Sequence, residues 1–381
     1  MGRILLLLSA VLFAVTPALM ATAIEIAPRD EALTFARSYE NGIPQKLLLV
    51  IRYENETITG IDVSQALGRP VFDPIILYNE LGRDAILAAL EVIPDSAAVT
   101  LPVTSLRMPV GLGGSHIAAG ANFPAHADDA EVEDGPFLFP KQAQPTHWTA
   151  PIPSGDGLLD YEAELCFVPL RDFPPVRTTR EIGLILCNDV TDRALLLKHI
   201  DAFDIQSGQG FTTGKSAPGY LPVGNLFVIP MDVESFARSL TLDLSVNGEI
   251  RQSALVLRMV WGLPEILRQT EGLKDRRWAF RGTRIGLPIR NGRVPARAMI
   301  MSGTPSGTVF EGIRTMHKVR GFLDYALGGW DRPMQLWVMD RYIREEQKLG
   351  RYLKPGDVVH MRVDRMGELR NPVMVSLNSR P

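Results

Sequence analysis

The chain has 381 residues, of which 46% are hydrophobic and 22% are charged, and its formal net charge is −3. These values exclude wholesale disorder, which requires low hydrophobicity and high net charge. They also give no sign of the basic surface that nucleic-acid binding requires, so we expect no nucleic-acid partner. The length allows two or three domains, or one large α/β fold with additions.

The first 23 residues have the pattern of a secretory signal peptide. Arg3 supplies a positive charge, residues 4–15 are almost entirely apolar, and residues 21–23 (ATA) form a small-x-small cleavage pattern. The alternative is an uncleaved membrane anchor, but the apolar stretch is shorter than the ~20 residues that a spanning helix requires. We therefore expect cleavage and export to the periplasm or medium, with no membrane attachment afterwards.

The remaining residues, 24–381, read as a β-rich mixed α/β chain. In a small N-terminal α+β region, 24–105, residues 47–53 (LLLVIRY) are typical of a strand and residues 82–92 of a helix. A second region, 106–381, begins with loops and short strands rich in Gly, Pro and Ala. Two apolar strands, 161–168 and 181–187, follow. Asn247-Gly248 between apolar runs predicts a hairpin, residues 310–350 are more helical and charged, and residues 358–363 (VVHMRV) predict a late strand.

Acidic residues gather at the two central strands. Glu162 and Glu164 alternate with apolar residues, so on a strand their side chains point to the same side. They belong either to a solvent-exposed face or to a cation site. Asp189 belongs to the polar run 188–193 that follows the second apolar strand, and polar residues at the end of a buried strand are where α/β folds place sites. Three such carboxylates would suit a hard divalent cation: Mg²⁺, Mn²⁺ or Ca²⁺.

A series of motifs makes residues 100–375 resemble the fumarylacetoacetate hydrolase (FAH) family. They occur in the family's order at residues 120–129 (GANFPAHADD), 136–141 (PFLFPK), 160–165 (DYEAEL), 188–193 (NDVTDR), 214–216 (GKS), 247–252 (NGEIRQ), 302–307 (SGTPSG), 353–357 (LKPGD) and 367–373 (GELRNPV). The resemblance implies the FAH-type β-roll as the catalytic core and a homodimer as the assembly.

The resemblance also implies a role for each matching residue. Glu162, Glu164 and Asp189 match the metal-binding carboxylates, with Mg²⁺ as the expected ion. His126 matches the histidine that activates water, and Asp129 stands where the family usually has its Glu partner. Three further residues match groups that contact the substrate or its developing charge: Lys215, Arg193 and Thr304.

Some positions depart from the family pattern. Asp129 is one methylene shorter than Glu, and Leu196 stands where several members carry a substrate-contacting Gln. Residues 308–352 fill a stretch that is usually much shorter, so we interpret them as an insert. Export is also unusual, because most relatives are intracellular.

The favoured hypothesis is an exported, metal-dependent hydrolase that cleaves a C–C bond in a β-diketo acid, such as an acylpyruvate. Decarboxylation, isomerisation or dehydration of a 2-oxo acid is the alternative, because the family supports all of these. A non-catalytic protein that binds a metal and an oxo acid is a second alternative.

The two cysteines allow a prediction from strand register. If the strands 161–168 and 181–187 are antiparallel and Glu164 faces Asp189, then Cys166 faces Cys187. Directly opposed residues have Cα atoms close enough for a disulfide. Export would permit that bond, and two packed thiols are the alternative.

Overall fold

The structure is a computed structural model, and it describes residues 23–376 apart from residues 92, 94–96, 131–134, 176–180 and 329–331. Residues 1–22 of the predicted signal peptide therefore lie outside the described residues. Within the described part of the chain, every helix is too short or too polar to cross a membrane.

A ten-stranded sheet forms the centre of the molecule. Its strand order is β4 (Val99–Pro102), β3 (Thr57–Asp62), β2 (Ile43–Glu54), β1 (Ala32–Glu40), β12 (Phe227–Pro230), β10 (Ile182–Asn188), β9 (Ala163–Pro169), β17 (Ile300–Met301), β5 (His116–Gly120) and β6 (Phe137–Lys141). Strands β9, β10 and β12 are buried along their whole length, which explains why apolar residues dominate their sequences.

The remaining strands form three smaller sheets. The largest has the order β14 (Glu249–Leu255), β13 (Thr241–Val246), β18 (Val358–Val363), β19 (Gly367–Val375) and β7 (Ile152–Ser154). The other two sheets have two strands each. One pairs β11 (Thr191–Asp192) with β8 (Leu159–Asp160), and the other pairs β15 (Trp278–Phe280) with β16 (Thr283–Ile285). The β13–β14 hairpin turns at Asn247 and Gly248, whose φ angles are 54° and 84°. Positive φ at both positions suits Asn-Gly, and the predicted hairpin is confirmed.

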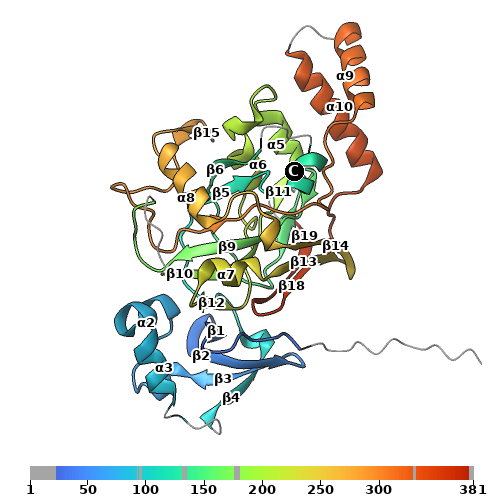
Figure 1. Cartoon of the computed structure of the whole chain (residues 1–381). Coiled ribbons are helices and arrows are strands. Elements are labelled where there is room, and N and C mark those ends of the chain that lie inside the picture. The colour runs from blue at the N-terminus through green and yellow to red at the C-terminus, as the bar shows by residue number, and fades with distance from the viewer. Residues whose placement is uncertain are drawn as a thin grey trace, which may run out of the picture.

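The helices lie around these sheets (Figure 1). Their bounds are α1 (Val63–Ala66), α2 (Pro74–Leu81), α3 (Arg83–Glu91), α4 (Pro124–Asp129), α5 (Arg193–His199), α6 (Phe211–Lys215), α7 (Val233–Arg238), α8 (Leu263–Gly272), α9 (Thr315–Gly328) and α10 (Met334–Leu349). The predicted strand 47–53 lies within β2, and the predicted strand 358–363 matches β18. The predicted helix 82–92 contains the shorter α3, and its last residue lies outside the described residues. The predicted β-rich mixed α/β class is confirmed.

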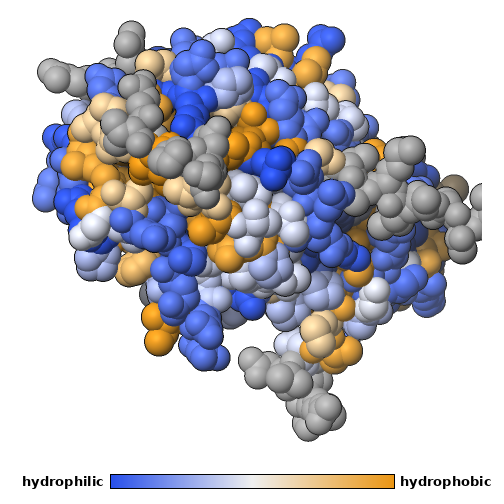
Figure 2. Space-filling view, turned by 90° about the horizontal axis from the view of Figure 1, so that it is seen from below, coloured by the Kyte–Doolittle hydropathy of each residue, from blue (hydrophilic) through white to orange (hydrophobic). Residues whose placement is uncertain are grey.

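The N-terminal strands belong to the same sheet as the central strands. Strand β1 pairs with β12 in antiparallel register, from Ala32 opposite Pro230 to Phe35 opposite Phe227. Figure 1 shows β1–β4 with α2 and α3 at one end of the molecule. Viewed from that end, the surface has hydrophobic patches separated by hydrophilic side chains (Figure 2).

The expected insert contains a pair of antiparallel helices. Helices α9 and α10 pack so closely at Gly321 that an added Cβ would lie 2.5 Å from the Cα atom of Val338. Asp324 pairs with Arg341 at 3.5 Å and with Arg344 at 3.2 Å. Figure 1 shows this helical hairpin at the end of the molecule opposite β1–β4.

A second apolar core attaches the helical hairpin to the central part of the protein. Met339 and Ile343 of α10 are buried in one cluster with Leu197 of α5. Phe310 packs against the same cluster, and its ring lies 5.8 Å from that of Tyr342. The α9–α10 hairpin therefore packs against the region around α5.

Strands β9 and β10 are antiparallel, as predicted, but their register differs from the predicted one by two residues. Cys187 lies opposite Glu164, and Cys166 lies opposite Ile185. The backbone N–H of Asp189 donates to the carbonyl of Glu162 at 2.9 Å, so Glu162 is the carboxylate that faces Asp189. The prediction that Glu164 faces Asp189 is wrong, because carboxylate side chains can converge without direct opposition.

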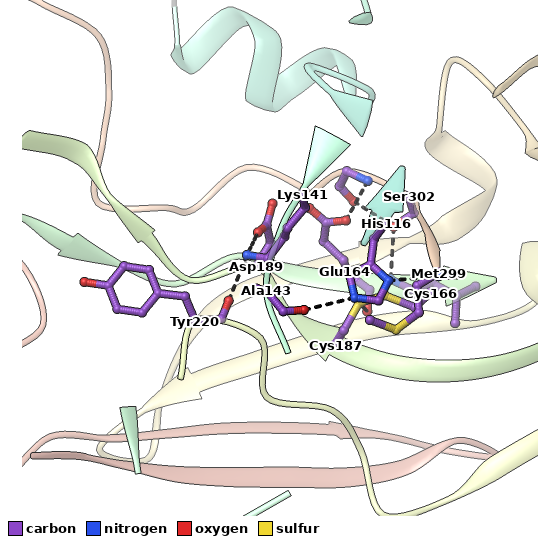
Figure 3. Close-up of a disulfide and its surroundings, with 12 residues drawn as sticks. His116, Lys141, Ala143, Glu164, Cys166, Cys187, Asp189, Tyr220, Met299 and Ser302 are labelled. Atoms are coloured by element: carbon purple, nitrogen blue, oxygen red, sulfur yellow. Dashed lines mark hydrogen bonds and ion pairs between the residues drawn. A yellow bond between two sulfur atoms is a disulfide. The ribbon is translucent and has the colours of Figure 1, made fainter. Parts of the chain in front are cut away.

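The two cysteines are nevertheless bonded to each other. They are diagonal neighbours on one face of the strand pair, with Cα atoms 6.2 Å apart, and they form a disulfide (Figure 3). A diagonal pair at this distance is within the range that a disulfide accepts. Their predicted proximity is confirmed, although direct opposition is not.

Candidate metal centre and active site

Three buried carboxylates converge where β9 begins and β10 ends. Glu162 is 4% exposed, and Glu164 and Asp189 are 0% exposed. One oxygen from each lies within 4.8 Å of the others. The sequence predicted this acidic triad of Glu162, Glu164 and Asp189, and the buried arrangement excludes the alternative of a solvent-exposed acidic face.

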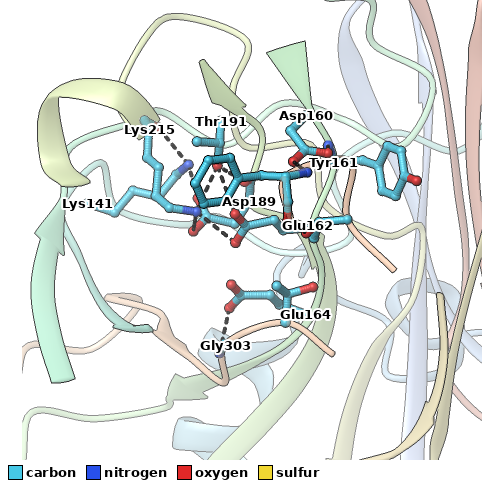
Figure 4. Close-up of polar contacts among 12 residues, drawn as sticks. Lys141, Asp160, Tyr161, Glu162, Glu164, Asp189, Thr191, Lys215 and Gly303 are labelled. Carbon is cyan, nitrogen blue, oxygen red and sulfur yellow. Dashed lines mark hydrogen bonds and ion pairs between the residues drawn. The ribbon is translucent and has the colours of Figure 1, made fainter. Parts of the chain in front are cut away.

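Cationic side chains surround two of the three carboxylates (Figure 4). Lys215 Nζ lies 2.7 Å from Glu162 Oε2 and 3.0 Å from Asp189 Oδ2. A second lysine, Lys141, pairs with the other oxygen of Asp189, and Arg193 pairs with Glu162 at 2.7 Å. All three cations reach the triad from outside β9 and β10.

These contacts keep Glu162 and its cations ionised. Burial alone would raise the pKa of Glu162, but Lys215 and Arg193 outweigh burial and lower the pKa to about 2. Burial lowers the pKa of Lys215, yet Asp189 and Glu162 raise it above its usual value. Burial dominates at Lys141 and lowers the pKa of that lysine in spite of Asp189.

Glu164 has a different environment. Its Oε2 accepts the backbone N–H of Gly303 at 2.9 Å, while its Oε1 is buried without a hydrogen-bond partner among the described residues. Burial raises the pKa of Glu164 well above its usual value, and Asp189 and Glu162 raise it further. A buried oxygen without a donor, inside a cluster of carboxylates, fits a hard divalent cation as its missing partner.

The charges of the cluster also fit a divalent cation. Four buried carboxylates, Asp160 and the triad, lie with three buried cations, Lys141, Lys215 and Arg193. In fully ionised form these described side chains carry one net negative charge. A divalent cation would change this to one net positive charge, which a monoanionic ligand would neutralise.

His126 and Asp129 lie on the short helix α4. His126 is 8% exposed, and its Nδ1 is buried without a hydrogen-bond partner among the described residues. Burial lowers the pKa of His126 to about 4, so the imidazole is neutral at pH 7. Asp129 is exposed. Burial of part of its carboxyl and the nearby Glu311 raise its pKa, in spite of a hydrogen bond from the backbone N–H of Gly307. The structure thus does not join the predicted pair by a hydrogen bond.

Thr304 lies in the loop that follows β17, next to the glycine that binds Glu164. It is 2% exposed, and its hydroxyl accepts a hydrogen bond from Gln252 Nε2 at 2.9 Å. The hydroxyl proton of Thr304 remains available to a ligand. The loop thus brings the predicted substrate-binding residue close to the triad.

Sequence reasoning assigned no role to Lys141, Asp160 and Thr191, which complete the network. Asp160 accepts from Arg193 Nε at 2.9 Å, and the Thr191 hydroxyl lies 2.7 Å from Lys215 Nζ. Lys141 ends the segment 136–141, and Asp160 and Thr191 lie inside the segments that contain the triad. A charged residue at the end of a buried strand was the signal that could have identified Lys141.

A cavity of about 400 Å³ lies beside the triad. Its polar end is formed by His126 and Arg193, and most of its other walls are apolar. Arg193 connects the two features, because it lines the cavity and also pairs with Glu162. The carboxylates themselves do not line this cavity.

The disulfide and a buried histidine support the strands beneath the triad (Figure 3). The backbone N–H of Met299 donates to His116 Nδ1 at 3.0 Å, and His116 Nε2 lies 3.1 Å from the carbonyl oxygen of Ala143. Burial lowers the pKa of His116 to about 3. This histidine is therefore neutral and holds β5 beside the segment that precedes β17.

Three comparisons place the chain among known proteins. The fumarylacetoacetate (FAA) hydrolase C-terminal family matches residues 115–374. The chain is 27% identical over 205 residues to oxaloacetate tautomerase YisK of Bacillus subtilis (strain 168), a match that covers 50% of this chain and 58% of that protein. The chain thus spans somewhat more than half the length of this curated relative.

Solved structures share the fold at low sequence identity. Fumarylacetoacetate hydrolase from the psychrophilic Exiguobacterium antarcticum has a TM-score of 0.56 at 20% identity, covering 90% of this chain and 99% of that chain. The 5-carboxymethyl-2-hydroxymuconate delta-isomerase from Mycobacterium smegmatis has a TM-score of 0.52 at 18% identity, with coverage of 90% and 99%. Because the family match extends over more than half of the sequence and includes the whole acidic triad, the chain belongs to the fumarylacetoacetate hydrolase family.

Proposed function

We propose that the protein is a metal-dependent hydrolase that cleaves the C–C bond of a β-diketo acid such as an acylpyruvate. The observation that carries this proposal is a neutral histidine, His126, which lines the cavity beside a buried acidic triad. A neutral imidazole can accept a proton from water, and the triad fits a divalent cation.

Glu162, Glu164 and Asp189 would hold the cation, and Mg²⁺ is the ion we expect. When bound, such an ion polarises the oxygens of a 2-oxo acid and offsets the charge that develops on the leaving group. Lys215 adds positive charge beside the triad, and the Thr304 hydroxyl offers a donor to a substrate oxygen. Arg193 is held between Glu162 and Asp160, so its charge is fixed in place.

The proposed reaction consumes one water. His126 takes a proton from the water, whose oxygen bonds to the distal carbonyl carbon. The bond between that carbon and the methylene then breaks, and the acyl group leaves as a carboxylate. The methylene carbon keeps the electron pair and takes up a proton, so the other product is pyruvate.

A substrate panel tests this proposal. We expect acetylpyruvate to yield pyruvate and acetate in equal amounts, with the activity lost in EDTA and restored by Mg²⁺ or Mn²⁺. Absence of pyruvate release from every acylpyruvate, together with CO₂ release from oxaloacetate, would overturn hydrolysis in favour of decarboxylation.

Proton transfer at carbon is a second candidate function, and one observation favours it. His126 has no hydrogen bond to Asp129 in this structure, whereas keto–enol isomerisation of a 2-oxo acid requires a base but no attacking water. The curated relative from Bacillus subtilis carries the name of an oxaloacetate tautomerase. Catalysed decay of enol-oxaloacetate absorbance, without release of pyruvate from any diketo acid, would establish this alternative.

We also propose export after cleavage near Ala23 and assembly as a homodimer. The N-terminal residue pattern supports export, and the buried disulfide is of the kind that persists in oxidising compartments. Family membership supports the dimer. Light scattering coupled to size-exclusion chromatography tests the dimer directly, and a monomer mass would overturn it.

A further inference from the structure

We propose that the cavity beside the triad binds the apolar acyl arm of a monoanionic 2-oxo acid, and that the α9–α10 hairpin gives the enzyme a preference for long or aryl arms. This inference rests on the proposed function, because it names the substrate class of the same site. It concerns the part of the substrate that is distant from the reacting carbons.

The chemistry of the walls excludes a strongly polar arm. Of the nineteen described residues that line the cavity, only His126, Arg193, Lys318 and Gln335 have polar side chains. The first two lie at the end near the triad. Buried polar groups of a ligand would find few partners against the remaining walls, and an unpaired buried polar group costs binding free energy.

The hairpin contributes its own residues to these walls. Val338 and Met339 of α10 line the cavity together with Leu196 and Leu197 of α5. Ile313, just before α9, lines it as well. Met339 is 6% exposed and Leu196 is 4% exposed, so both are packed in place. The cavity therefore has an apolar wall that exists only because residues 308–352 are present.

The cavity is large enough for a sizeable arm. A cavity of about 150 Å³ lined by apolar side chains can hold benzene, and this one measures about 400 Å³. Phenyl, pentyl and heptyl arms would each fit within that volume. An acetyl group would leave most of it unfilled.

The charge of the site favours one carboxylate in the ligand. With a divalent cation bound, the buried cluster would carry one net positive charge, which a single 2-oxo carboxylate neutralises. A second carboxylate at the distal end would enter the apolar cavity. Lys318 is the wall residue that could meet it, but its side chain is exposed, so its charge is weakened by solvent.

Chain length is the first test. With 2,4-dioxo acids that carry methyl, propyl, pentyl and phenyl arms, we expect kcat/KM to rise about three- to four-fold per added methylene, since each buried methylene contributes a nearly constant free energy. The pentyl substrate should therefore exceed the methyl substrate roughly 100-fold. A substrate whose arm has the same length but ends in a carboxylate should have the lower kcat/KM.

Two matched variants locate the effect in the cavity. Leu196→Gln places an amide in the apolar wall, and we expect the pentyl-to-methyl ratio of kcat/KM to fall at least ten-fold. Leu323→Gln makes the same chemical change on α9, at a residue that is 49% exposed and does not line the cavity, and we expect the wild-type ratio. Thermal melting of both variants confirms that each is folded.

A binding measurement separates this inference from the proposed function. Calorimetry with Mn²⁺ present should show that 2-oxooctanoate binds at least ten-fold more tightly than pyruvate, and that Leu196→Gln removes most of the difference. If acetylpyruvate is cleaved, but long and short arms give the same kcat/KM and the same affinity in both wild type and Leu196→Gln, the cavity inference is wrong and hydrolysis stands. If no diketo acid is cleaved but 2-oxooctanoate shows the preference, hydrolysis is wrong and the cavity inference stands. Preference for the dicarboxylate overturns the apolar-arm assignment.

Discussion

Glu164 differs from the other two triad residues because no cationic side chain among the described residues forms an ion pair with it. Its pKa is raised by burial, by Asp189 and by Glu162, so in metal-free protein the ionised form opposes folding. As pH rises above the ordinary value for a glutamate, this residue therefore makes the metal-free protein less stable. A bound divalent cation would instead favour the ionised form of Glu164 and make the folded protein more stable.

We predict that Glu164→Gln removes divalent-cation binding and leaves the protein in EDTA as stable as the wild type, or more stable. Titration calorimetry with Mn²⁺ and thermal melting at pH 7.5 measure the two effects. Glu346→Gln is the control, because Glu346 is 1% exposed on α10 and pairs with Arg351 instead. Wild-type Mn²⁺ affinity in Glu164→Gln would show that the triad is only an ionic network.

For His126 we predict that replacement by Ala lowers hydrolysis about 10²- to 10⁴-fold, as general-base loss typically does, and preserves Mn²⁺-dependent binding of oxalate. Because its pKa is about 4, the base form persists as pH falls, and kcat/KM should decline only near pH 4. Asp129→Asn should cost less than His126→Ala. Equal losses would show that the two residues pair during turnover.

His116 gives a prediction about acid stability. Its pKa is about 3 in the folded protein against 6.5 for the ordinary side chain. Between these values the unfolded chain binds more protons, so the free energy of unfolding falls as pH drops, by at most about 1.4 kcal/mol per pH unit. Urea unfolding at pH 7 and pH 4.5 should show a smaller pH effect in His116→Gln. His199→Gln, at an exposed histidine, should retain the wild-type pH effect.

At this scale the sequence predicted which carboxylates form the triad but not which cations neutralise them. Glu162 directly precedes β9 and Glu164 lies within it, so their two-residue spacing is a local property that the sequence shows. Lys141 reaches Asp189 from a strand 48 positions earlier in the chain, and no spacing in the sequence encodes that contact. An alternating sequence pattern predicts which side chains lie on one face of a strand. It does not predict which residues from distant parts of the chain will contact them.

The disulfide between β9 and β10 belongs to the scale of elements. It closes a segment of 21 residues, and a loop of this size is expected to contribute about 3 kcal/mol. We predict that purified mature protein has no titratable thiols under denaturing conditions, and that reduction lowers its melting temperature. The Cys166→Ala/Cys187→Ala double variant should melt lower as well and should not respond to the reductant. Two thiols per chain in unreduced protein would contradict the disulfide.

Helix packing in the hairpin gives a second prediction at this scale. Gly321→Ala would place a Cβ 2.5 Å from the Cα of Val338, whereas a Cβ at Gly328 would meet its nearest atom, on Trp337, at 3.9 Å. We expect Gly321→Ala to separate the helices and to speed proteolysis within residues 308–352. Gly328→Ala is the matched control on the same helix. It should leave the cleavage rate unchanged or lower it, because Ala favours the helix more than Gly does. Equal rates would contradict the close packing.

Elements were predictable where the local pattern was strong. The Asn247-Gly248 turn and the apolar strands β9 and β10 follow from turn chemistry and hydrophobic runs. The register of those two strands did not follow, because side-chain length lets carboxylates two residues out of register meet at one point. The helical character of residues 310–350 was readable, but their position against α5 depends on tertiary packing.

For the whole molecule, we predict that the mature protein begins at or near Ile24. Ile24 is 2% exposed, and its backbone N–H donates to the carbonyl of Tyr53 at 3.0 Å, so a chain that starts there can still dock its first residue. Intact-mass spectrometry of the protein from the native host, after cell fractionation, measures the start. Full-length mass in the membrane fraction would support the anchor instead.

The loop that binds Glu164 comes from far along the chain. Gly303 and Glu164 are separated by 139 positions, and the backbone N–H of Val309, which donates to Asp160 at 3.0 Å, is 149 positions from its acceptor. Contacts between such distant residues form slowly, because the chain must close a long loop before they contribute. A nascent chain that ends before residue 303 lacks the donor that orients Glu164. The donor that orients Glu164 is therefore among the last parts of the site to be made, and a cation that needs the complete triad would be selected from the ions around the completed polypeptide.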